Sequence, residues 1–270
     1  MTSLRGFVLQ PTYQLEDGRA VVHLHGKLED GRSFLVRDGR EVPRFYVLTD
    51  DAGTARSLGV RSLRPTDQVT LEGRPVARVD VAAPPDVPPL RDRLRRAGVA
   101  CYEADVRFAI RYLIDRGIRG SLTIEGDGRP RDGIGLVFEN PWVGPADWTP
   151  RLSVLSFDIE TDPEARRLLS VGLHGCGASE VLLLSPVGHD CPPGAVPFPT
   201  EKDLLLAFAR RVRELDPDVL TGWNVVDFDL AVLDRLATRN RLRLELGRGA
   251  GTLRLRGDRS NRGGRHADRV

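Results

Sequence analysis

The 270-residue sequence predicts an α/β protein with a β-rich first domain and a second domain of mixed strands and helices. Its length favours about two domains. Before residue 150, short runs of β-branched and aromatic residues alternate with Gly, Asp and Pro, a pattern typical of short strands and turns. After residue 150, strand patterns are interleaved with longer helical ones. The 40% hydrophobic and 29% charged residues, with only three Cys, exclude a wholly disordered chain and a disulfide scaffold.

The first part should contain short strands and two or three short helices, each helix ended by a Gly. Asp105 should cap the last of these helices. The Pro-rich run 83–89 should be a surface loop, because Pro lacks an amide donor. The turn-rich run 140–150 is the expected boundary between domains 1–148 and 149–245. We expect strands at 6–10, 19–26, 33–36, 45–49, 76–81, 122–126 and 135–139, and helices at 51–58, 90–97 and from 105 to 117.

The second part has a clearer order of elements. Thr200 and Asp203 resemble a capping box at the start of its first helix, and Asn224 can cap its second helix. We expect strands at 152–160, 168–175, 180–186 and 218–223, and helices at 200–215 and 225–239. Three strands, a helix, a strand and a helix fit the ribonuclease-H-like fold, although other α/β folds share parts of this order.

The charge is divided unevenly along the chain. Residues 241–270 carry nine Arg against three acidic residues, a net charge of +6, so the first 240 residues carry −4. The same end has six Gly and few large apolar residues to close a core. We therefore expect residues 246–270 to be a basic tail, truncated or disordered, with contact to nucleic-acid phosphates as the alternative.

Two acidic residues share one face of the strand at 152–160. Because successive side chains point to opposite faces, Asp158 and Glu160 project together while Phe157 and Ile159 share the other face. Like charges held side by side repel each other, and a divalent cation removes that conflict. The alternative is two acids at a solvated strand end, because Asp-x-Glu alone is a weak signal.

A third acid lies on the apolar face of the helix at 225–239. Asp229 shares that face with Leu233 and Leu236, and an ionised carboxylate there needs a partner. A salt bridge to an Arg is the structural alternative. Taken with the strand pair about 70 residues earlier, however, Asp229 suits a carboxylate cluster for metal-assisted phosphoryl chemistry.

Three segments resemble family B DNA polymerases, most closely the bacterial DNA polymerase II group. FDIET at 157–161 looks like the first exonuclease motif of the family, and GWNVVDFDL at 222–230 resembles the second. YEADVRFAIRYLIDR at 102–116 is similar to the segment that precedes the exonuclease domain. The resemblance spans about residues 1–245 and implies a β-rich N-terminal domain followed by the front part of a 3′→5′ proofreading exonuclease.

The resemblance also implies roles for individual residues. Asp158 would bind two metal ions, Mg²⁺ or Mn²⁺, Glu160 would bind one of them, and Asp229 would complete the site directly or through water. The channel for a frayed, single-stranded 3′ DNA end would be lined by Thr161, Asn224 and Phe228. Base stacking gives Phe228 a physical reason for this place, although simple helix packing explains it equally well.

One expected feature of the family does not occur. The third exonuclease motif, Tyr-x-x-x-Asp, should lie well beyond residue 245, and no Tyr follows residue 112. The chain alone should therefore show little or no exonuclease activity. The resemblance further implies primer–template DNA as a partner, polymerase domains that carry DNA synthesis, and a possible sliding-clamp contact through a missing C-terminus.

Two other functions remain open from the residues alone: a DNA-binding fragment without hydrolysis, and a stand-alone ribonuclease-H-like exonuclease on DNA or RNA. The latter requires a third acidic motif near the C-terminus, where only Asp258 and Asp268 occur after residue 245. No apolar run reaches the roughly 20 residues that cross a bilayer, and the start lacks a signal-peptide pattern. A cytoplasmic location without membrane contact is expected.

Overall fold

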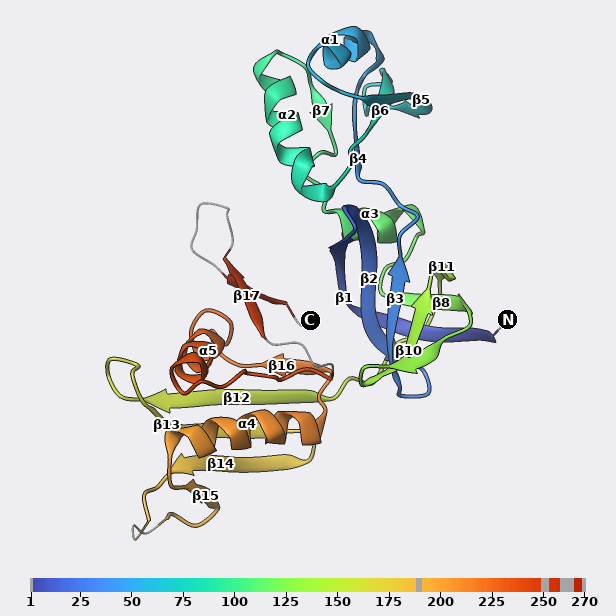
Figure 1. Ribbon diagram of the computed structural model, residues 1–270. Helices are drawn as coiled ribbons and strands as arrows, with labels where there is room; N and C mark the ends of the chain where they lie inside the picture. Colours follow the sequence, from blue (N-terminus) through green and yellow to red (C-terminus); the bar gives the residue numbers. More distant parts are fainter. Residues whose placement is uncertain (1, 188–190, 249–252, 258–264, 269–270) are drawn as a thin grey trace. The chain divides into compact units, whose positions relative to one another are not determined.

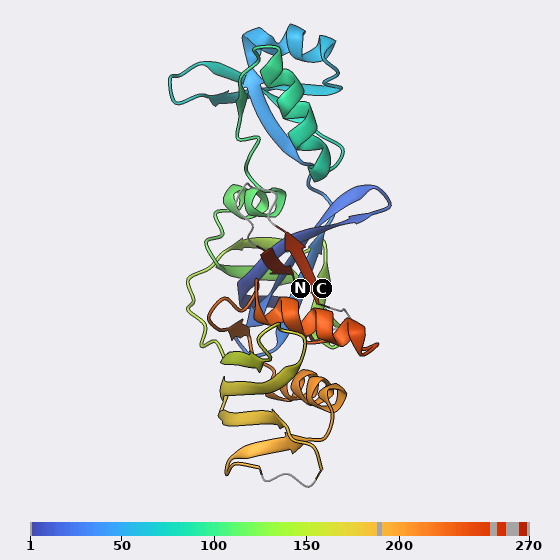
Figure 2. The same cartoon turned by 90° about the vertical axis from the view of Figure 1, so that its left-hand side faces the viewer.

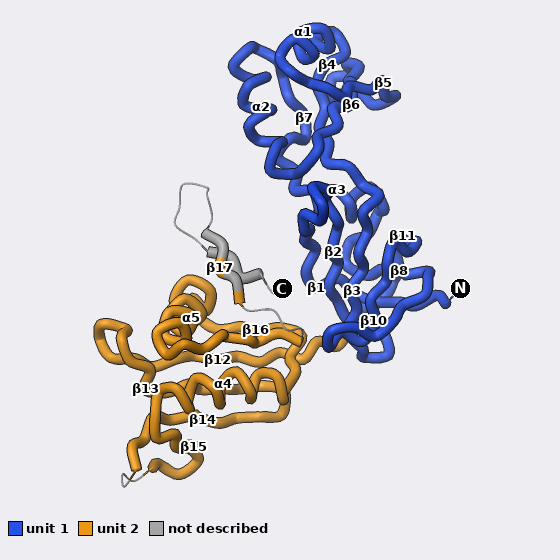
Figure 3. Tube along the Cα trace, in the orientation of Figure 1, with its two compact units in different colours: residues 1–150 blue, residues 151–270 orange. Residues whose placement is uncertain are grey.

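The computed structural model describes residues 2–187, 191–248, 253–257 and 265–268. The chain divides into two compact units, Met1–Pro150 and Arg151–Val270 (Figure 3). Strands outnumber helices in both units, and each unit has its own hydrophobic core (Figure 1). The expectation of a mixed, strand-rich α/β protein is confirmed.

The larger lobe of unit 1 is a seven-stranded sheet. Its strands, in order across the sheet, are β11 (Trp142–Pro145), β8 (Ser121–Gly126), β1 (Thr2–Glu16), β2 (Arg19–Leu28), β3 (Ser33–Asp38), β10 (Ile134–Glu139) and β9 (Arg129–Arg131). Helix α3 (Phe108–Asp115) packs Phe108 and Tyr112 into the core of this lobe, beside apolar residues of β1 and β2. Alternation of side chains along the strands thus supplies one buried face for the helix.

The smaller lobe of unit 1 inserts between β3 and α3. Its elements are β4 (Arg44–Leu48), η1 (Thr49–Asp51), α1 (Ala52–Ser57), β5 (Ser62–Val69), β6 (Pro75–Asp80), η2 (Pro84–Asp86), α2 (Val87–Arg96) and β7 (Cys101–Tyr102). The sheet order is β5-β6-β4-β7, with antiparallel neighbours throughout. A strand–helix–strand–strand–helix–strand chain with this order is the ferredoxin-like arrangement.

Three sequence-based expectations for unit 1 are wrong. Strand β5 was not expected, because it is largely exposed and contains Pro65, which an edge strand tolerates. Helix α2 begins at Val87, so the expected loop 83–89 ends earlier; Pro residues fit the first turn, where the amide donor has no partner in any case. Helix α3 begins at Phe108, so Asp105 does not cap it.

Unit 2 is built on a five-stranded sheet. Its order is β15 (Ala195–Phe198), β14 (Ala178–Leu184), β13 (Leu168–Gly175), β12 (Val154–Thr161) and β16 (Val219–Thr221). Strands β12, β13 and β14 are antiparallel, whereas β16 runs parallel to β12 and β15 runs parallel to β14. This arrangement agrees with the expected ribonuclease-H-like order. Strand β15 was not among the expected strands, because its Pro-rich surroundings hide a four-residue edge strand.

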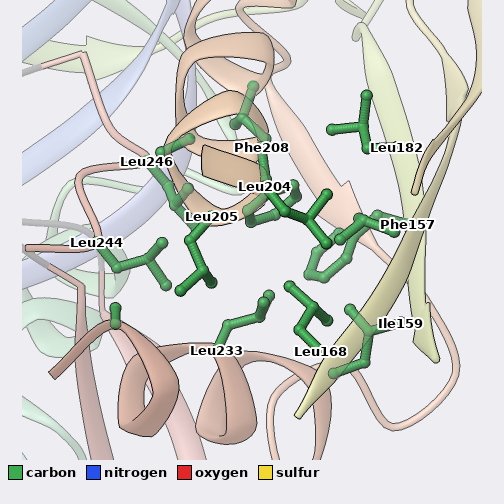
Figure 4. Close-up of a cluster of buried hydrophobic side chains, with 14 of the residues drawn as sticks. Phe157, Ile159, Leu168, Leu182, Leu204, Leu205, Phe208, Leu233, Leu244 and Leu246 are labelled. Atoms are coloured by element: carbon green, nitrogen blue, oxygen red, sulfur yellow. The ribbon is translucent and has the colours of Figure 1, made fainter. Parts of the chain in front are cut away.

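Two helices, α4 (Glu201–Leu215) and α5 (Asp229–Arg239), cover one face of this sheet (Figure 2). Figure 4 shows their apolar side chains meeting Phe157 and Ile159 of β12. The predicted capping box at α4 is confirmed, since Thr200 Oγ1 accepts a hydrogen bond from Asp203 N–H at 3.1 Å. No helix in the described ranges is long and apolar enough to cross a membrane.

The residues after α5 continue the core of unit 2. Leu244 and Leu246 are 4% and 6% exposed and pack among the helix residues (Figure 4), so the expectation that nothing after residue 240 could close a core is wrong. Further along, β17 (Arg254–Gly257) pairs antiparallel with β18 (Arg265–Asp268). The two apolar residues at 244 and 246 were hidden in the sequence by the surrounding Arg and Gly.

A buried acid fastens α3 to the large sheet of unit 1. Asp38 is fully buried and accepts hydrogen bonds from the Tyr112 hydroxyl at 2.7 Å and from Arg40 Nη2 at 2.6 Å. The same Arg40 nitrogen donates to the carbonyl oxygen of Pro141 at 2.6 Å. Burial by itself raises the pKa of Asp38, but the hydrogen bonds from Arg40 and Tyr112 outweigh it and lower that pKa.

A matched pair of variants tests the weight of this buried acid. Asp38 and Asp30 both begin an Asp-Gly-Arg turn and receive the same three hydrogen bonds from Arg40 and Arg32, but the Asp30 side chain is 44% exposed. Asp38→Ala should lower the free energy of unfolding by about 3 kcal/mol, because it leaves buried donors unpaired. Asp30→Ala should change it far less, since solvent screens that pair. Urea unfolding at pH 7 measures both.

The same pair carries a pH signature. Because the folded-state pKa of Asp38 is lowered, its stabilisation is present above the ordinary Asp pKa and is lost as pH falls through the lowered value. The gap in unfolding free energy between wild type and Asp38→Ala should therefore shrink below about pH 4. Equal losses from the two variants at neutral pH, or a gap independent of pH, would contradict the role assigned to Asp38.

Candidate active site

Strand β12 separates apolar and acidic side chains onto its two faces. Phe157 and Ile159 are 2% and 5% exposed and lie in the core beneath the helices. Asp158 and Glu160 alternate with them and are exposed on the opposite face. The predicted projection of both acids from one face is confirmed, because it follows directly from strand geometry.

Asp229 is the first residue of α5 and is only 1% exposed. Its Oδ1 accepts a hydrogen bond from the Ile159 backbone N–H at 3.1 Å. In the described part of the chain no basic side chain forms an ion pair with it, so the alternative of a salt bridge to Arg is not supported. The partner that this carboxylate requires is the backbone of β12.

This hydrogen bond has a consequence for the strand acids. Ile159 lies between Asp158 and Glu160 in the sequence, so the bond brings the start of α5 to the part of β12 that carries both of them. Burial raises the pKa of Asp229, the backbone hydrogen bonds oppose this shift, and the negative charge of Asp158 adds to it. The charge of Asp158 therefore reaches Asp229 across the contact between β12 and α5.

The three acids do not form a closed ligand set. Across the described residues, no group of three or more His, Cys, Asp or Glu side chains is arranged to hold a metal ion. Asp158 and Glu160 face solvent, whereas Asp229 is buried and held by Ile159. The structure thus brings the three predicted residues to one part of the sheet, but their carboxylates do not surround a common point.

The segment between β16 and α5 differs from the expected helix. Asn224 adopts a left-handed backbone conformation with φ of 56°, and α5 begins five residues later, so the prediction that Asn224 caps this helix is wrong. The Phe228 N–H donates to the Asn224 carbonyl at 3.0 Å. A Cβ added to Gly222 would lie 2.4 Å from the carbonyl oxygen of Phe157, which explains why this position requires Gly. The chain therefore turns tightly beside β12 before α5 begins.

The predicted channel residues lie at the ends of these two segments. Thr161 ends β12, is half-buried and donates a hydrogen bond from Oγ1 to the Asp162 carbonyl at 2.9 Å. Asn224 is exposed, and the Phe228 side chain is 42% exposed. The Phe228 ring is thus partly packed and partly open to solvent.

Sequence reasoning missed Trp223. This side chain is 92% exposed and lies between Gly222 and Asn224 in the same turn. The signal available in the sequence was an aromatic residue at the end of a predicted strand, but an isolated Trp is more often a core residue.

A hollow of about 500 Å³ adjoins Asp158 on the face of the sheet that the helices leave open. Gly172 of β13 pairs directly with Asp158, and a Cβ at Gly172 would meet nothing within 4 Å. The missing side chain keeps the space over Asp158 open. His174 borders the same hollow and lies 3.4 Å from Ser179, measured from Nδ1 to Oγ.

Both the sequence and the fold of this chain are similar to those of known proteins. A family model described as "DNA polymerase family B, exonuclease domain" matches residues 179–263. The matched stretch contains Asp229 and the 222–228 turn, whereas β12 with Asp158 and Glu160 precedes it.

Relatives occur in bacteria and archaea. The chain is 39% identical to DNA polymerase II of Escherichia coli (strain K12) over 161 residues, which cover 58% of this chain and 20% of that protein. It is 31% identical to the DNA polymerase of Thermococcus sp. (strain 9oN-7) over 260 residues, 89% of this chain and 30% of that protein. The DNA polymerase of Archaeoglobus fulgidus is 29% identical over 98% of this chain and 34% of its own length. The chain spans about a third or less of these relatives.

The fold gives the same answer. The chain resembles the structure of the family B DNA polymerase from the hyperthermophilic archaeon Pyrobaculum calidifontis, with a TM-score of 0.72 and 25% identity, over 93% of this chain and 34% of that one. Bacterial and archaeal enzymes both match, so the comparisons do not distinguish one branch from the other. Residues 179–263 therefore resemble the exonuclease domain of family B DNA polymerases, and most of the chain resembles the fold of such an enzyme.

Proposed function

We propose that this chain supplies the proofreading 3′→5′ exonuclease part of a family B DNA polymerase of the bacterial polymerase II type. Its substrate is the unpaired 3′ end of primer–template DNA, and DNA synthesis and any sliding-clamp contact belong to polymerase segments that this sequence does not contain. The observation that supports the proposal is the hydrogen bond from the Ile159 N–H to Asp229, because Ile159 lies between Asp158 and Glu160 in β12.

The chemistry of these residues fits divalent metal ions. Asp229 is buried without a basic partner in the described chain, and the charge of Asp158 disfavours its ionised form further. Mg²⁺ or Mn²⁺ relieves such a conflict, because hard cations prefer carboxylate oxygens. Asp158, Glu160 and Asp229 would hold the metal. When bound, two such ions activate a water molecule and stabilise the leaving 3′ oxygen of DNA.

The remaining residues of the site position the DNA end. Thr161 and Asn224 offer polar groups at the ends of β12 and of the turn, and Phe228 offers an exposed ring. Base–aromatic stacking is insensitive to base sequence, which suits an enzyme that removes any mispaired nucleotide. The open hollow beside Asp158 gives water access to the strand acids.

A second function, DNA binding without hydrolysis by this chain alone, is favoured by one pair of observations. The described residues form no closed metal cluster, and the sequence offers no Tyr after residue 112 for the third exonuclease motif. Both observations predict that binding of single-stranded DNA exceeds its degradation.

Hydrolysis separates the two functions. The chain should degrade 5′-labelled single-stranded DNA with Mg²⁺ only weakly, and Asp158→Ala should abolish the residual activity while binding persists. Glu164→Ala is the control, because Glu164 is an exposed loop acid outside the site. Robust degradation that depends on Asp158 would show that the third motif is dispensable. Residual degradation that survives Asp158→Ala would remove this acid from the proposed site.

A stability measurement tests the metal site independently of activity. Asp229→Asn should raise the free energy of unfolding by about 1 kcal/mol without divalent cations, because it removes a buried charge and keeps an oxygen for Ile159. Mn²⁺ should stabilise the wild type, since the ion binds only the folded chain, and should not stabilise the variant.

Asp234→Asn is the matched control on the same helix. Burial alone raises the pKa of Asp234, with no contribution from Asp158. Its substitution should leave the stabilisation by Mn²⁺ intact. Thermal unfolding with EDTA and then with Mn²⁺ measures all three proteins, and equal metal stabilisation of wild type and Asp229→Asn would exclude Asp229 as a ligand.

A further inference from the structure

The most exposed aromatic residue of the described chain is Trp223. Its side chain is 92% exposed, compared with 56% for Trp142, which is the only other Trp among the exposed large hydrophobic residues. A Trp side chain normally buries about 150–250 Å² of its surface when the protein folds. An indole left almost entirely in water is accessible for stacking against a ligand.

Trp223 lies at the functional end of the sheet. Strands β12 and β16 pair in parallel, and the last pair joins Ser156 to Thr221. Trp223 follows Thr221 by two residues, as Asp158 follows Ser156, so Trp223 lies just past the carboxyl end of β16, beside the part of β12 that carries Asp158. In open α/β sheets, ligands bind outside the carboxyl ends of the strands.

The turn that carries Trp223 is fixed on both sides. Gly222 touches the Phe157 carbonyl so closely that no Cβ fits, and Val225 packs against the core of unit 2. The Leu230 N–H also donates to the Val225 carbonyl at 2.8 Å. The exposure of the ring thus results from the fixed conformation of this turn. A ring held in position before binding loses little conformational freedom when a ligand binds.

The surroundings select the face of a base over a phosphate. The exposed acids Asp158 and Glu160 lie at this part of the unit, so a phosphate without bound cations is repelled there. A nucleobase is uncharged and stacks on aromatic rings. Phe228, 42% exposed in the same turn, is a second ring for the adjacent nucleotide.

We propose that Trp223 is a positioning residue that stacks on an unpaired base of single-stranded DNA and directs its 3′ end toward the acids of β12. The inference rests on the proposed exonuclease function and adds a residue to it. Trp223 contacts a base rather than the scissile phosphate, so its loss should weaken binding of the substrate while leaving the chemistry of the acids unchanged.

Fluorescence reports this contact directly. The sequence has three Trp, so the double variant Trp142→Phe and Trp148→Phe retains Trp223 as its only indole. Titration with a single-stranded oligothymidylate in Ca²⁺ buffer should quench its emission, whereas a blunt duplex with every 3′ base paired should not. Trp223→Ala should weaken single-strand binding about 5- to 100-fold, as expected for the loss of one stacked base.

Two further variants separate stacking from structural damage. Trp223→Phe retains an aromatic face and should recover most of the affinity lost in Trp223→Ala. Trp142→Ala removes an exposed Trp from unit 1 and should leave the affinity unchanged. Circular dichroism and thermal unfolding confirm that each variant is folded.

The possible outcomes distinguish the role of Trp223 from the proposed exonuclease function. If the wild type binds single-stranded DNA but Trp223 emission is unchanged and Trp223→Ala binds equally well, the inference is overturned and the proposed function stands. If the wild type binds no single-stranded DNA with Ca²⁺ or Mn²⁺, both the inference and the proposed function are overturned.

Discussion

The alternation of side chains along β12 is the constraint on which the second unit depends. A strand that packs beneath two helices must give one face to apolar residues, and Phe157 and Ile159 occupy that face. The same geometry forces Asp158 and Glu160 onto the open face. The Ile159 amide then meets Asp229 at the start of α5. One strand therefore provides the core, displays two acids and anchors the third, so a shift of its register by one residue would undo the core and the site together.

Two buried acids, Asp38 and Asp229, show how the surroundings of a carboxylate set its pKa and its structural role. Asp38 in unit 1 is surrounded by Arg40 and Tyr112, and its pKa is lowered despite burial. Asp229 receives backbone hydrogen bonds and feels the charge of Asp158, and its pKa is raised. The first environment already satisfies a carboxylate, whereas the second disfavours the ionised form, so that a proton or a bound cation would stabilise it. Pairs of acids left in that condition are typical of sites that bind metal ions.

The turn at 222–228 connects the sheet with this chemistry. Gly222 allows the chain to approach β12 closely, and with Asn224 in a left-handed conformation α5 begins only at Asp229. The buried acid is therefore the first residue of the helix, and Trp223 and Phe228 in the preceding turn face solvent. A helix that began at residue 225, as the sequence pattern suggests, would carry these side chains around its axis instead of holding them in one fixed turn.

Sequence alone determined the features that depend on local periodicity. These are the strands β12, β13 and β14, the capping box at Thr200 and the common face of Asp158 and Glu160, because each follows from spacing along one element. Features that depend on distant partners were decided by the tertiary structure. The largely exposed strand β5 depends on pairing with β6, and Leu244 and Leu246 are recognised as core residues only once the helices lie beside them. The partner of Asp229 is a backbone amide 70 residues away, which has no side-chain signature in the sequence. The exposure of Trp223 likewise arises from a turn whose shape is set by its contact with β12. Local sequence propensities do not indicate which side chains remain without contacts in the folded chain.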